Sequence, residues 1–586
     1  MTFLKLILSI LDSEKKFKML LLFILMFIGM AFEVGGISLL LPTLTVIMDE
    51  DFLEKNLLVN NYLPDFIFQI SHLELILTFI FFIIFYYLIK TIFLIFLSHK
   101  ISSFAYEVKR ELTQEFLNGY LLQDYQIHLK RNSSTIIRNM TTEVSLFIDV
   151  LKQFLILGTE GLVLIGITFF LFFIQPISML IIFIVLGLSS YAFYQFNKAR
   201  LLSWGEIRQT HEAKRLQSLQ QGIFGIKEVK VYGKELNFSN IFSNHNFLTT
   251  SADRKQYFLS QLPRIWMESL TILTILGVII FLIIQNNSPS EIIPILGILA
   301  AAAFRVLPSL TRIMHSFQTI RYARPVVDLI IEEFKNFEKH NLDLKFNNKK
   351  EKVNKISFTE NIRFENCSFR YSKNSDSVLS EINILISKGE TIGIIGESGS
   401  GKSTFVDLFM GLLMFSEGSM FVDGEDVSNN IQGWQKNIGY VPQSIYINDD
   451  TLAKNIAFGI NDKNISKDKL NKAIKDAQLD DLVRSLEYGV DTYIGERGVR
   501  LSGGQIQRVG IARALYENPD VIVLDEASSA LDSQTEKEII KSINSLSETK
   551  TIVMIAHRTS TLSGCDRIFE LSKGKIIREC TFEDIQ

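Results

Sequence analysis

The chain has 586 residues, of which 47% are hydrophobic and 21% charged, and its mean hydropathy is positive at +0.22. A composition this apolar favours a protein that lies partly in lipid. The formal net charge of −3 gives no global basic field, so we expect no nucleic acid partner. The three cysteines, Cys367, Cys565 and Cys580, do not suit a disulfide scaffold or a zinc cluster, and they indicate a reducing compartment.

Six apolar runs lie in the first half of the chain. The first two, 19–48 and 75–97, each exceed the roughly 20 residues that a helix needs to cross a hydrocarbon core. The other four lie at about 150–175, 177–195, 265–285 and 291–312. The length of the first run and its lack of a small-residue cleavage site favour a retained helix over a signal peptide. We therefore predict an all-α transmembrane domain of six helices within residues 1–330.

Lysine and arginine lie before the first run and in the connections that follow the second and fourth runs. They include Lys15, Lys16, Lys18, Lys109, Arg110, Lys130, Arg131, Arg138, Lys198, Arg200, Arg208, Lys214, Arg215, Lys227, Lys230 and Lys234. By the positive-inside rule these segments and both termini face the cytoplasm. The two inner connections are too long for hairpins, which predicts helices that continue beyond the bilayer and two coupling helices, near 124–131 and 228–234. The outer connection at 50–72 suits either an interfacial amphipathic helix or a plain loop.

Four charged residues in or beside the apolar runs stand out: Lys90, Arg264, Glu268 and Arg305. A central charge costs about 2.5–3.5 kcal/mol on insertion scales, so it suggests a functional site. At about 1.5 Å per residue, the three cations all fall in the inner half of the bilayer. We therefore expect Lys90, Arg264 and Arg305 to bind an anionic headgroup, particularly a pyrophosphate, that enters from the cytoplasmic leaflet.

Structural readings of these charges stay open. Arg264 can extend its charge to the cytoplasmic edge, and Lys90 can be neutralised by Glu160, which lies at a similar depth on the third run. Glu33, with Gly35 and Gly36, is expected to support helix packing or a kink in the first run.

From Ile362 onward, short β-like runs alternate with turns and helices, which predicts an α/β domain at 357–586 after a linker at 331–356. An apolar strand at 391–395 precedes GESGSGKST and a helix-like segment, the context of a phosphate-binding P-loop. Its backbone N–H groups suit the phosphates of ATP, Lys402 places a positive charge on them, and Ser403 offers a hydroxyl to Mg²⁺. The predicted loop residues are Gly396, Glu397, Ser398, Gly399, Ser400, Gly401, Lys402, Ser403 and Thr404.

Three further segments accompany the P-loop. The apolar strand VIVLDE ends in Asp525, which suits magnesium, and Glu526, which suits alignment of the attacking water. LSGGQ at 501–505 leads directly into a helical segment, and a glycine turn at a helix N-terminus binds anions. His557 follows a predicted strand, where it can donate a hydrogen bond to a γ-phosphate, although a lone histidine is more often structural.

These motifs and their order resemble the ATPase domain of an ABC transporter, of which LSGGQ is the signature. The resemblance implies that Tyr371 stacks on adenine, that Gln443 contacts magnesium, and that Asp532 belongs to a loop facing the partner subunit. The implied catalytic residues are Glu526, His557, Gln443 and Lys402, and the implied metal ligands are Ser403, Gln443 and Asp525. GERG at 495–498 resembles an element of exporters.

The resemblance also implies a shared nucleotide site. The signature residues Ser502, Gly503, Gly504 and Gln505 of one copy would complete the ATP site of a second copy. With one set of motifs and six spans, the chain resembles a type IV exporter half-transporter that works as a homodimer.

The strings LPRIWMES at 262–269, AFRVLPSLTRI at 303–313 and GIKEVKVYGKE at 225–235 resemble PglK-type bacterial lipid-linked oligosaccharide flippases. This resemblance implies a multi-pass protein of the bacterial inner membrane with a cytoplasmic ATPase domain and a role in glycosylation. It implies that Arg264 and Arg305 bind the pyrophosphate of a polyprenyl carrier, whereas Lys90 departs from the arginine of that family. The alternatives are an exporter of peptides, drugs or other lipids, and a non-transporting ATP-gated channel or regulator.

Overall fold

The computed structural model describes residues 8, 10–48, 71–174, 176–284, 289–340, 342, 354–372, 374–495, 498–526, 549–556 and 559–585. The chain divides into two compact units. The first comprises Met1–Gln123 and Arg131–Phe346, and the second comprises Asp124–Lys130 and Asn347–Gln586.

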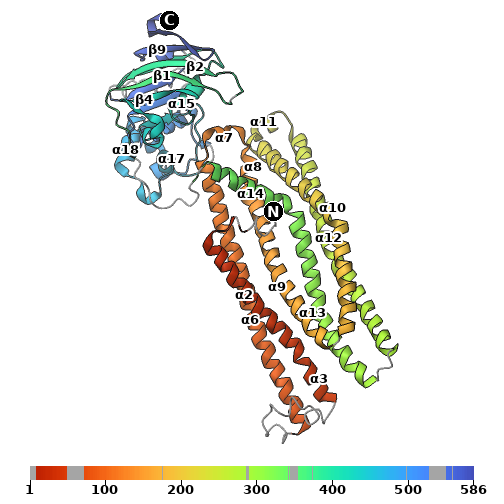
Figure 1. The fold of residues 1–586 in the computed structure, drawn as a ribbon. Helices are drawn as coiled ribbons and strands as arrows, with labels where there is room; N and C mark the ends of the chain where they lie inside the picture. The colour runs from red at the N-terminus through yellow and green to blue at the C-terminus, as the bar shows by residue number, and fades with distance from the viewer. Residues whose placement is uncertain are drawn as a thin grey trace. The chain divides into compact units, whose positions relative to one another are not determined.

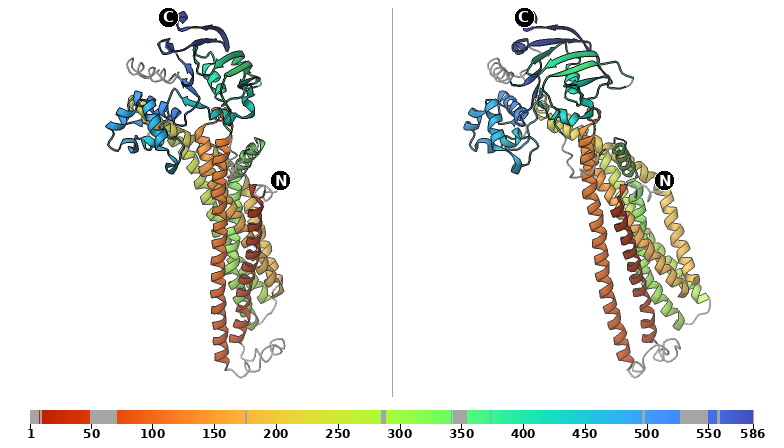
Figure 2. Two further views of the ribbon diagram at one scale, coloured as in Figure 1. Left: turned by 90° about the vertical axis from the view of Figure 1, so that its left-hand side faces the viewer. Right: turned by 60° about the vertical axis from the view of Figure 1, so that its left-hand side comes forward.

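The first unit is built of long helices that run side by side (Figures 1 and 2). They are α2 (Ser13–Ser38), α3 (Leu40–Met48), α6 (His72–Leu122), α8 (Ser133–Arg138), a π-helical turn (Asn139–Glu143), α9 (Val144–Ile174), α10 (Pro176–Phe224), α11 (Ile226–Val231), α12 (Glu235–Ile284), α13 (Pro289–Tyr322) and α14 (Arg324–Lys339). Within the described ranges, five helical stretches are long and apolar enough to cross a membrane. Helix α13 contains the sixth predicted apolar run, 291–312.

Three helices are much longer than a bilayer is thick. α6, α10 and α12 have 51, 49 and 50 residues, so each exceeds by far the roughly 20 residues that span about 30 Å of hydrocarbon. The predicted continuation of the spans beyond the bilayer is therefore confirmed. α10 and α12 pack along each other and are joined at their tip by α11 (Figure 1). Most of the predicted outer connection at 50–72 lies outside the described residues.

α14 differs from the prediction of a linker at 331–356. Through Lys339 the chain is helical, and its apolar face is buried in the first unit at Ile330, Ile331 and Phe337. The Phe337 ring packs edge-to-face on Phe116 at 5.6 Å between centroids. The amphipathic spacing of these residues is that of a packed surface helix, which explains why this stretch is not a linker.

The second unit is an α/β structure with two sheets. The antiparallel sheet has the order β2 (Leu379–Ser387), β1 (Asn361–Phe369), β4 (Glu417–Val422) and β5 (Glu425–Asp426). The other has the order β10 (Lys575–Cys580), β9 (Arg567–Ser572), β3 (Thr391–Ile395), β8 (Thr551–Ile555), β7 (Val521–Asp525) and β6 (Ile438–Val441). An apolar core that includes Phe364, Phe405 and Trp434 holds the sheets and helix α15 together.

The helices of this unit are α7 (Tyr125–Lys130), α15 (Lys402–Phe409), α16 (Ile431–Gln435), α17 (Leu452–Ile456), α18 (Lys467–Asp476), α19 (Asp480–Ser485) and α20 (Gly503–Leu515). Short 3₁₀ helices lie at Val427–Asn429, Asp462–Asn464, Gly489–Asp491, Thr559–Leu562 and Phe582–Ile585. Figure 2 shows α17–α19 (blue) as a helical lobe beside the sheets. Strands β3, β8, β7 and β6 are mutually parallel, so their carboxyl ends meet at one edge.

Candidate nucleotide site and membrane charge network

The P-loop connects β3 to the N-terminus of α15. Gly401, the residue before this helix, has a φ of 107°, which strongly favours glycine. A Cβ on Gly396 would lie 2.1 Å from the carbonyl oxygen of Leu571, so the loop accepts no side chain there. The Ser400 hydroxyl is buried and has no hydrogen-bond partner among the described residues. This narrow loop with an unsatisfied hydroxyl at a helix N-terminus fits the phosphates of a nucleotide.

Lys402 is buried against the P-loop backbone. Its Nζ donates hydrogen bonds to the carbonyl oxygens of Gly396 at 2.7 Å and of Glu397 at 2.9 Å. Burial lowers the pKa of Lys402, while the carboxylates of Glu526 and Asp525 oppose this shift. The ammonium group and the two acids that end β7 are therefore within electrostatic range of each other.

The structure brings Gln443 and Glu526 together. Gln443 follows β6, Glu526 follows the neighbouring strand β7, and Gln443 Nε2 donates to Glu526 Oε2 at 2.5 Å. Glu526 has a φ of 48°, a left-handed conformation that is rare for a non-glycine residue. Strained residues of this kind gather at functional sites. Oxygen ligands from Asp525 and Gln443, with the Ser403 hydroxyl, have the chemistry that Mg²⁺ prefers.

Asp407 is a residue of this region that the sequence analysis did not identify. It lies on α15, and burial together with the charge of Asp525 raises its pKa to about 6. The same two influences raise the pKa of Tyr440 on β6. Asp407 lies outside the P-loop pattern, and only the packing of α15 on β7 brings it near Asp525.

The LSGGQ segment begins helix α20 with a reciprocal cap. Ser502 Oγ accepts from the backbone N–H of Gln505 at 3.3 Å, and Gln505 Oε1 accepts from the N–H of Ser502 at 2.9 Å. Gly503 is exposed on the first turn. Among the described residues, neither Ser502 nor Gly504 forms a hydrogen bond to the P-loop of its own chain.

Tyr371 lies beside the P-loop helix and also contacts α7. Its hydroxyl lies 3.2 Å from Thr404 Oγ1. Its carbonyl oxygen accepts hydrogen bonds from Gln126 Nε2 at 2.8 Å and from Lys130 Nζ at 3.4 Å. Helix α7, which lies in the first predicted coupling segment, thus contacts Tyr371 within the second unit.

Three predicted features lie outside the described residues. They are His557, Asp532 and the central two residues of the GERG element, at 496–497.

In the first unit, Lys90 and Arg305 belong to a buried charge network on α2, α6, α9 and α13. Glu33 Oε2 lies 2.8 Å from Lys90 Nζ and 3.0 Å from Arg305 Nε. Glu160 Oε2 lies 3.3 Å from Arg305 Nη1, and its Oε1 lies 2.5 Å from Arg312 Nη1. The Ser309 hydroxyl donates to Glu160 at 2.7 Å.

This network corrects two sequence-based expectations. Lys90 pairs with Glu33 and not with Glu160, because α2 and α6 pack together closely enough for Tyr86 to donate to the carbonyl oxygen of Phe32 at 2.9 Å. Glu33 is therefore a counter-charge for two cations as well as a neighbour of the small residues Gly35 and Gly36. A Cβ on Gly35 would lie 2.3 Å from the Tyr86 hydroxyl, so this glycine does serve helix packing.

Arg264 does not join the network. It is exposed on α12, and no ion pair to it occurs among the described residues. Arg312, which the sequence analysis did not select, takes part instead. The sequence signalled Arg312 only by its spacing: it lies seven positions after Arg305, which is two helical turns along the same face.

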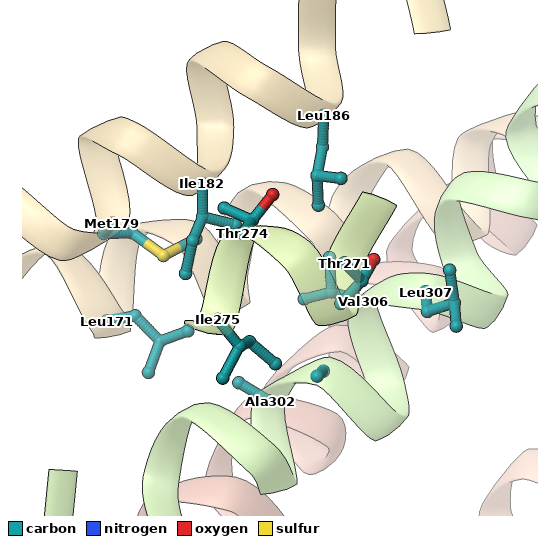
Figure 3. Close-up of a pocket in the computed structure, with 11 residues that line it drawn as sticks. Leu171, Met179, Ile182, Leu186, Thr271, Thr274, Ile275, Ala302, Val306 and Leu307 are labelled. Carbon is teal, nitrogen blue, oxygen red and sulfur yellow. The ribbon is translucent and has the colours of Figure 1, made fainter. Parts of the chain in front are cut away.

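Two hollows between the helices differ in size. A small pocket of about 20 Å³, toward which apolar side chains from α9, α10, α12 and α13 point, has room for roughly one water molecule (Figure 3). A larger groove of about 990 Å³ between α10 and α12 is lined by aromatic side chains and by Arg200 and Lys255. Of these two, the larger groove has room for a lipid-sized molecule.

The fold defines the class of protein. The structure resembles a solved bacterial Atm1-family ABC exporter with ATP bound, with a TM-score of 0.78 over 97% of this chain and 96% of that chain. The sequence identity is 20%, so this likeness concerns the fold. The predicted architecture, a helical transmembrane domain followed by an α/β ATPase domain in the type IV exporter fold, is confirmed.

The family follows from the sequence matches. Residues 19–301 match the ABC transporter transmembrane region, and residues 379–529 match the ABC transporter family. The chain belongs to the ABC transporters and has the organisation of an exporter half-transporter, with one membrane region and one ATPase domain.

Curated relatives match over part of their length. The chain is 39% identical over 216 residues to the ATP-dependent lipid A-core flippase of Pasteurella multocida, a match that spans 37% of each protein. It is 40% identical over 226 residues to the ABC transporter ATP-binding protein YwjA of Bacillus subtilis, a match that spans 38% of this chain and 39% of the relative. These matches therefore cover little more than a third of the relatives' length.

Proposed function

We propose that two copies of this chain form an ATP-driven flippase that moves a polyprenyl-pyrophosphate-linked oligosaccharide from the cytoplasmic to the outer face of a bacterial inner membrane. Both termini and the ATPase domain would lie in the cytoplasm. The observation that carries the proposal is the group of cations within the membrane helices, since such charges are costly in lipid and suit an anionic headgroup.

The nucleotide chemistry follows from the arrangement at the carboxyl edge of the parallel strands. The P-loop backbone and Lys402 would hold the phosphates, and Tyr371 would stack on the adenine. Ser403, Gln443 and Asp525 would hold Mg²⁺, which neutralises phosphate charge when bound. Glu526 would align the attacking water, with Gln443 fixing its carboxylate through the observed hydrogen bond.

The second copy would complete each site. Ser502 and Gly504 would approach the γ-phosphate held by the partner's P-loop, since a helix N-terminus favours an anion. His557 and Asp532 would add contacts to the phosphate and to the partner. Closure of two such sites around ATP would drive rearrangement of the membrane helices, with α7 as one point of transmission.

Transport of some other anionic lipid is the second candidate function. It is favoured by the lipid A-core flippases among the curated relatives. Peptide or drug export and ATP-gated regulation have no comparable observation in their favour.

Reconstituted vesicles test the function. Purified full-length protein should move a fluorescent polyprenyl-pyrophosphate glycan across the bilayer when ATP is supplied, and Glu526→Gln should abolish movement. Arg264→Ala should reduce the rate roughly tenfold, because an exposed charged hydrogen-bond donor is lost. Arg254→Ala, an exposed arginine on the same helix, is the matched control and should leave transport unchanged.

Movement of other anionic lipids, with none of the polyprenyl-linked glycan, would favour the second candidate. ATP hydrolysis without movement of any lipid would contradict both.

A further inference from the structure

Positive and negative groups alternate along the buried network. The order runs from Lys90 through Glu33, Arg305 and Glu160 to Arg312, with each neighbouring pair within 3.3 Å. The five groups come from four helices, α2, α6, α9 and α13, which lie side by side (Figure 1). Three cations face two carboxylates, so the network keeps one net positive charge.

The two ends of this chain of charges differ in exposure. The side chain of Lys90 at one end is 12% exposed, whereas that of Arg312 at the other end is 59% exposed. Between them, Glu33 and Glu160 are 5% and 4% exposed. A buried carboxylate is stable only while it is paired and hydrogen-bonded. The surplus positive charge is therefore accessible at Arg312.

The Glu160 carboxylate is bound by two guanidinium groups and a hydroxyl, the same donors that would bind two oxygens of a phosphate group. Its two oxygens pair with different guanidinium groups, Oε2 with Arg305 and Oε1 with Arg312. Ser309 adds a hydroxyl donor to the same carboxylate. Guanidinium groups favour planar, two-oxygen recognition of carboxylates and phosphates alike, so a phosphate presents the same acceptor edge with more charge.

We propose that Glu160 acts as an internal competitor: it occupies, through Arg305 and Arg312, the cationic site to which the proposed function brings the lipid diphosphate headgroup. The inference deepens the proposed function by naming the regulation of its cargo site. The incoming anion first meets Arg312, then replaces Glu160 on both guanidinium groups. Glu33 pairs with Nε of Arg305, a different nitrogen from the one that Glu160 approaches, and positions the guanidinium group.

An equilibrium binding experiment without ATP tests this separately from transport. The full-length protein in detergent is titrated against a fluorescent short-chain polyprenyl pyrophosphate, and anisotropy gives the Kd. Glu160→Gln should lower the Kd roughly tenfold, because the neutral amide competes less for two cations. Arg312→Gln should raise it roughly tenfold, and Arg312→Lys should raise it less, because lysine retains the charge without the planar fork.

Matched controls separate this effect from general changes of charge. Glu268→Gln on α12 alters an exposed residue, and Arg321→Gln on α13 alters a half-buried residue whose Nε donates to the carbonyl oxygen of Lys198. Both residues lie outside the network, and both variants should leave the Kd unchanged. Glu160→Asp keeps the negative charge and should bind no more tightly than the wild type. Thermal unfolding of each variant checks that the helices remain packed.

The outcomes are distinct. An unchanged or raised Kd for Glu160→Gln would overturn the competitor role, and an unchanged Kd for Arg312→Gln would overturn the site. Equal displacement of the probe by sodium pyrophosphate would overturn the lipid headgroup as the occupant. The predicted pattern of affinities in a protein that moves no lipid would support the site and contradict the proposed function.

Discussion

At the scale of single residues, Asp407 shows how packing changes the pKa of a carboxyl group that belongs to no sequence motif. It lies on α15, the helix that begins with the last P-loop residues, where it is half-buried near Asp525. Burial and the neighbouring charge both favour its protonated form and raise its pKa to about 6. Both influences therefore oppose the charged state of Asp407 in the folded protein.

The sign of the pH effect follows from this shift. The ordinary pKa of Asp is about 3.9, so between roughly pH 4 and pH 6 the folded state binds more protons and stability falls as the pH rises. Asp407→Asn should therefore stabilise the protein at pH 7.5, by on the order of 1 kcal/mol after allowance for partial exposure. The gain should vanish near pH 4.

Thermal unfolding of the full chain at both pH values checks this prediction. The exposed Asp449 offers the matched control, Asp449→Asn, for which no such pH-dependent gain is expected. A larger gain at pH 4 than at pH 7.5 would show that the assigned cause is wrong.

At the scale of an element, α7 is a six-residue helix whose neighbours in the chain, α6 and α8, belong to the first unit. Its own residues group with the second unit, and two of its side chains donate to the carbonyl oxygen of Tyr371. Burial, with the charges of Asp407 and Tyr371, raises the pKa of Tyr125 on the same helix. The short helix thus contacts the residue predicted to carry the adenine.

Gln126→Ala should weaken transmission between nucleotide and membrane. It removes the 2.8 Å hydrogen bond to Tyr371 while leaving the P-loop intact, so ATP hydrolysis should continue and lipid movement per ATP should fall several-fold. Gln114→Ala, which removes a 2.9 Å hydrogen bond to Asn118 within α6, is the matched control.

The measurement is the ratio of lipid moved to phosphate released in reconstituted vesicles. An unchanged ratio for Gln126→Ala would show that the Tyr371 contact does not transmit the signal.

At the scale of the whole molecule, each chain has one P-loop and one signature segment. The described structure shows no hydrogen bond from Ser502 or Gly504 to the P-loop of the same chain. If the functional unit is a homodimer, each ATP site uses the P-loop of one subunit and the signature of the other.

Complementation tests this arrangement. Lys402→Ala disables a P-loop and Gly504→Asp disables a signature, so each variant alone should be inactive. Expressed together in equal amounts, they should recover about a quarter of the wild-type ATP hydrolysis, since half the dimers are mixed and each of these has one intact site. No recovery in isolated mixed dimers would contradict the shared site.

The local pattern was enough to predict much of this protein. The length of the apolar runs predicted the membrane helices, because a helix needs about 20 apolar residues to cross the hydrocarbon core of a bilayer. The strands β3 and β7 and the helical start after Ser502 were also predicted correctly, since glycine turns and apolar runs act locally. The packed helix after residue 331 was not predicted, because its burial depends on α6.

Partners far apart in the chain were decided only by the tertiary structure. The pairing of Lys90 with Glu33, the role of Arg312 and the contact between Gln443 and Glu526 join residues separated by 57 to 152 positions. The sequence shows the sign of a charged residue and its approximate depth in the membrane. Which residue pairs with it depends on which helices pack together. Periodicity records which face of a helix is apolar and leaves the identity of the neighbouring helix open.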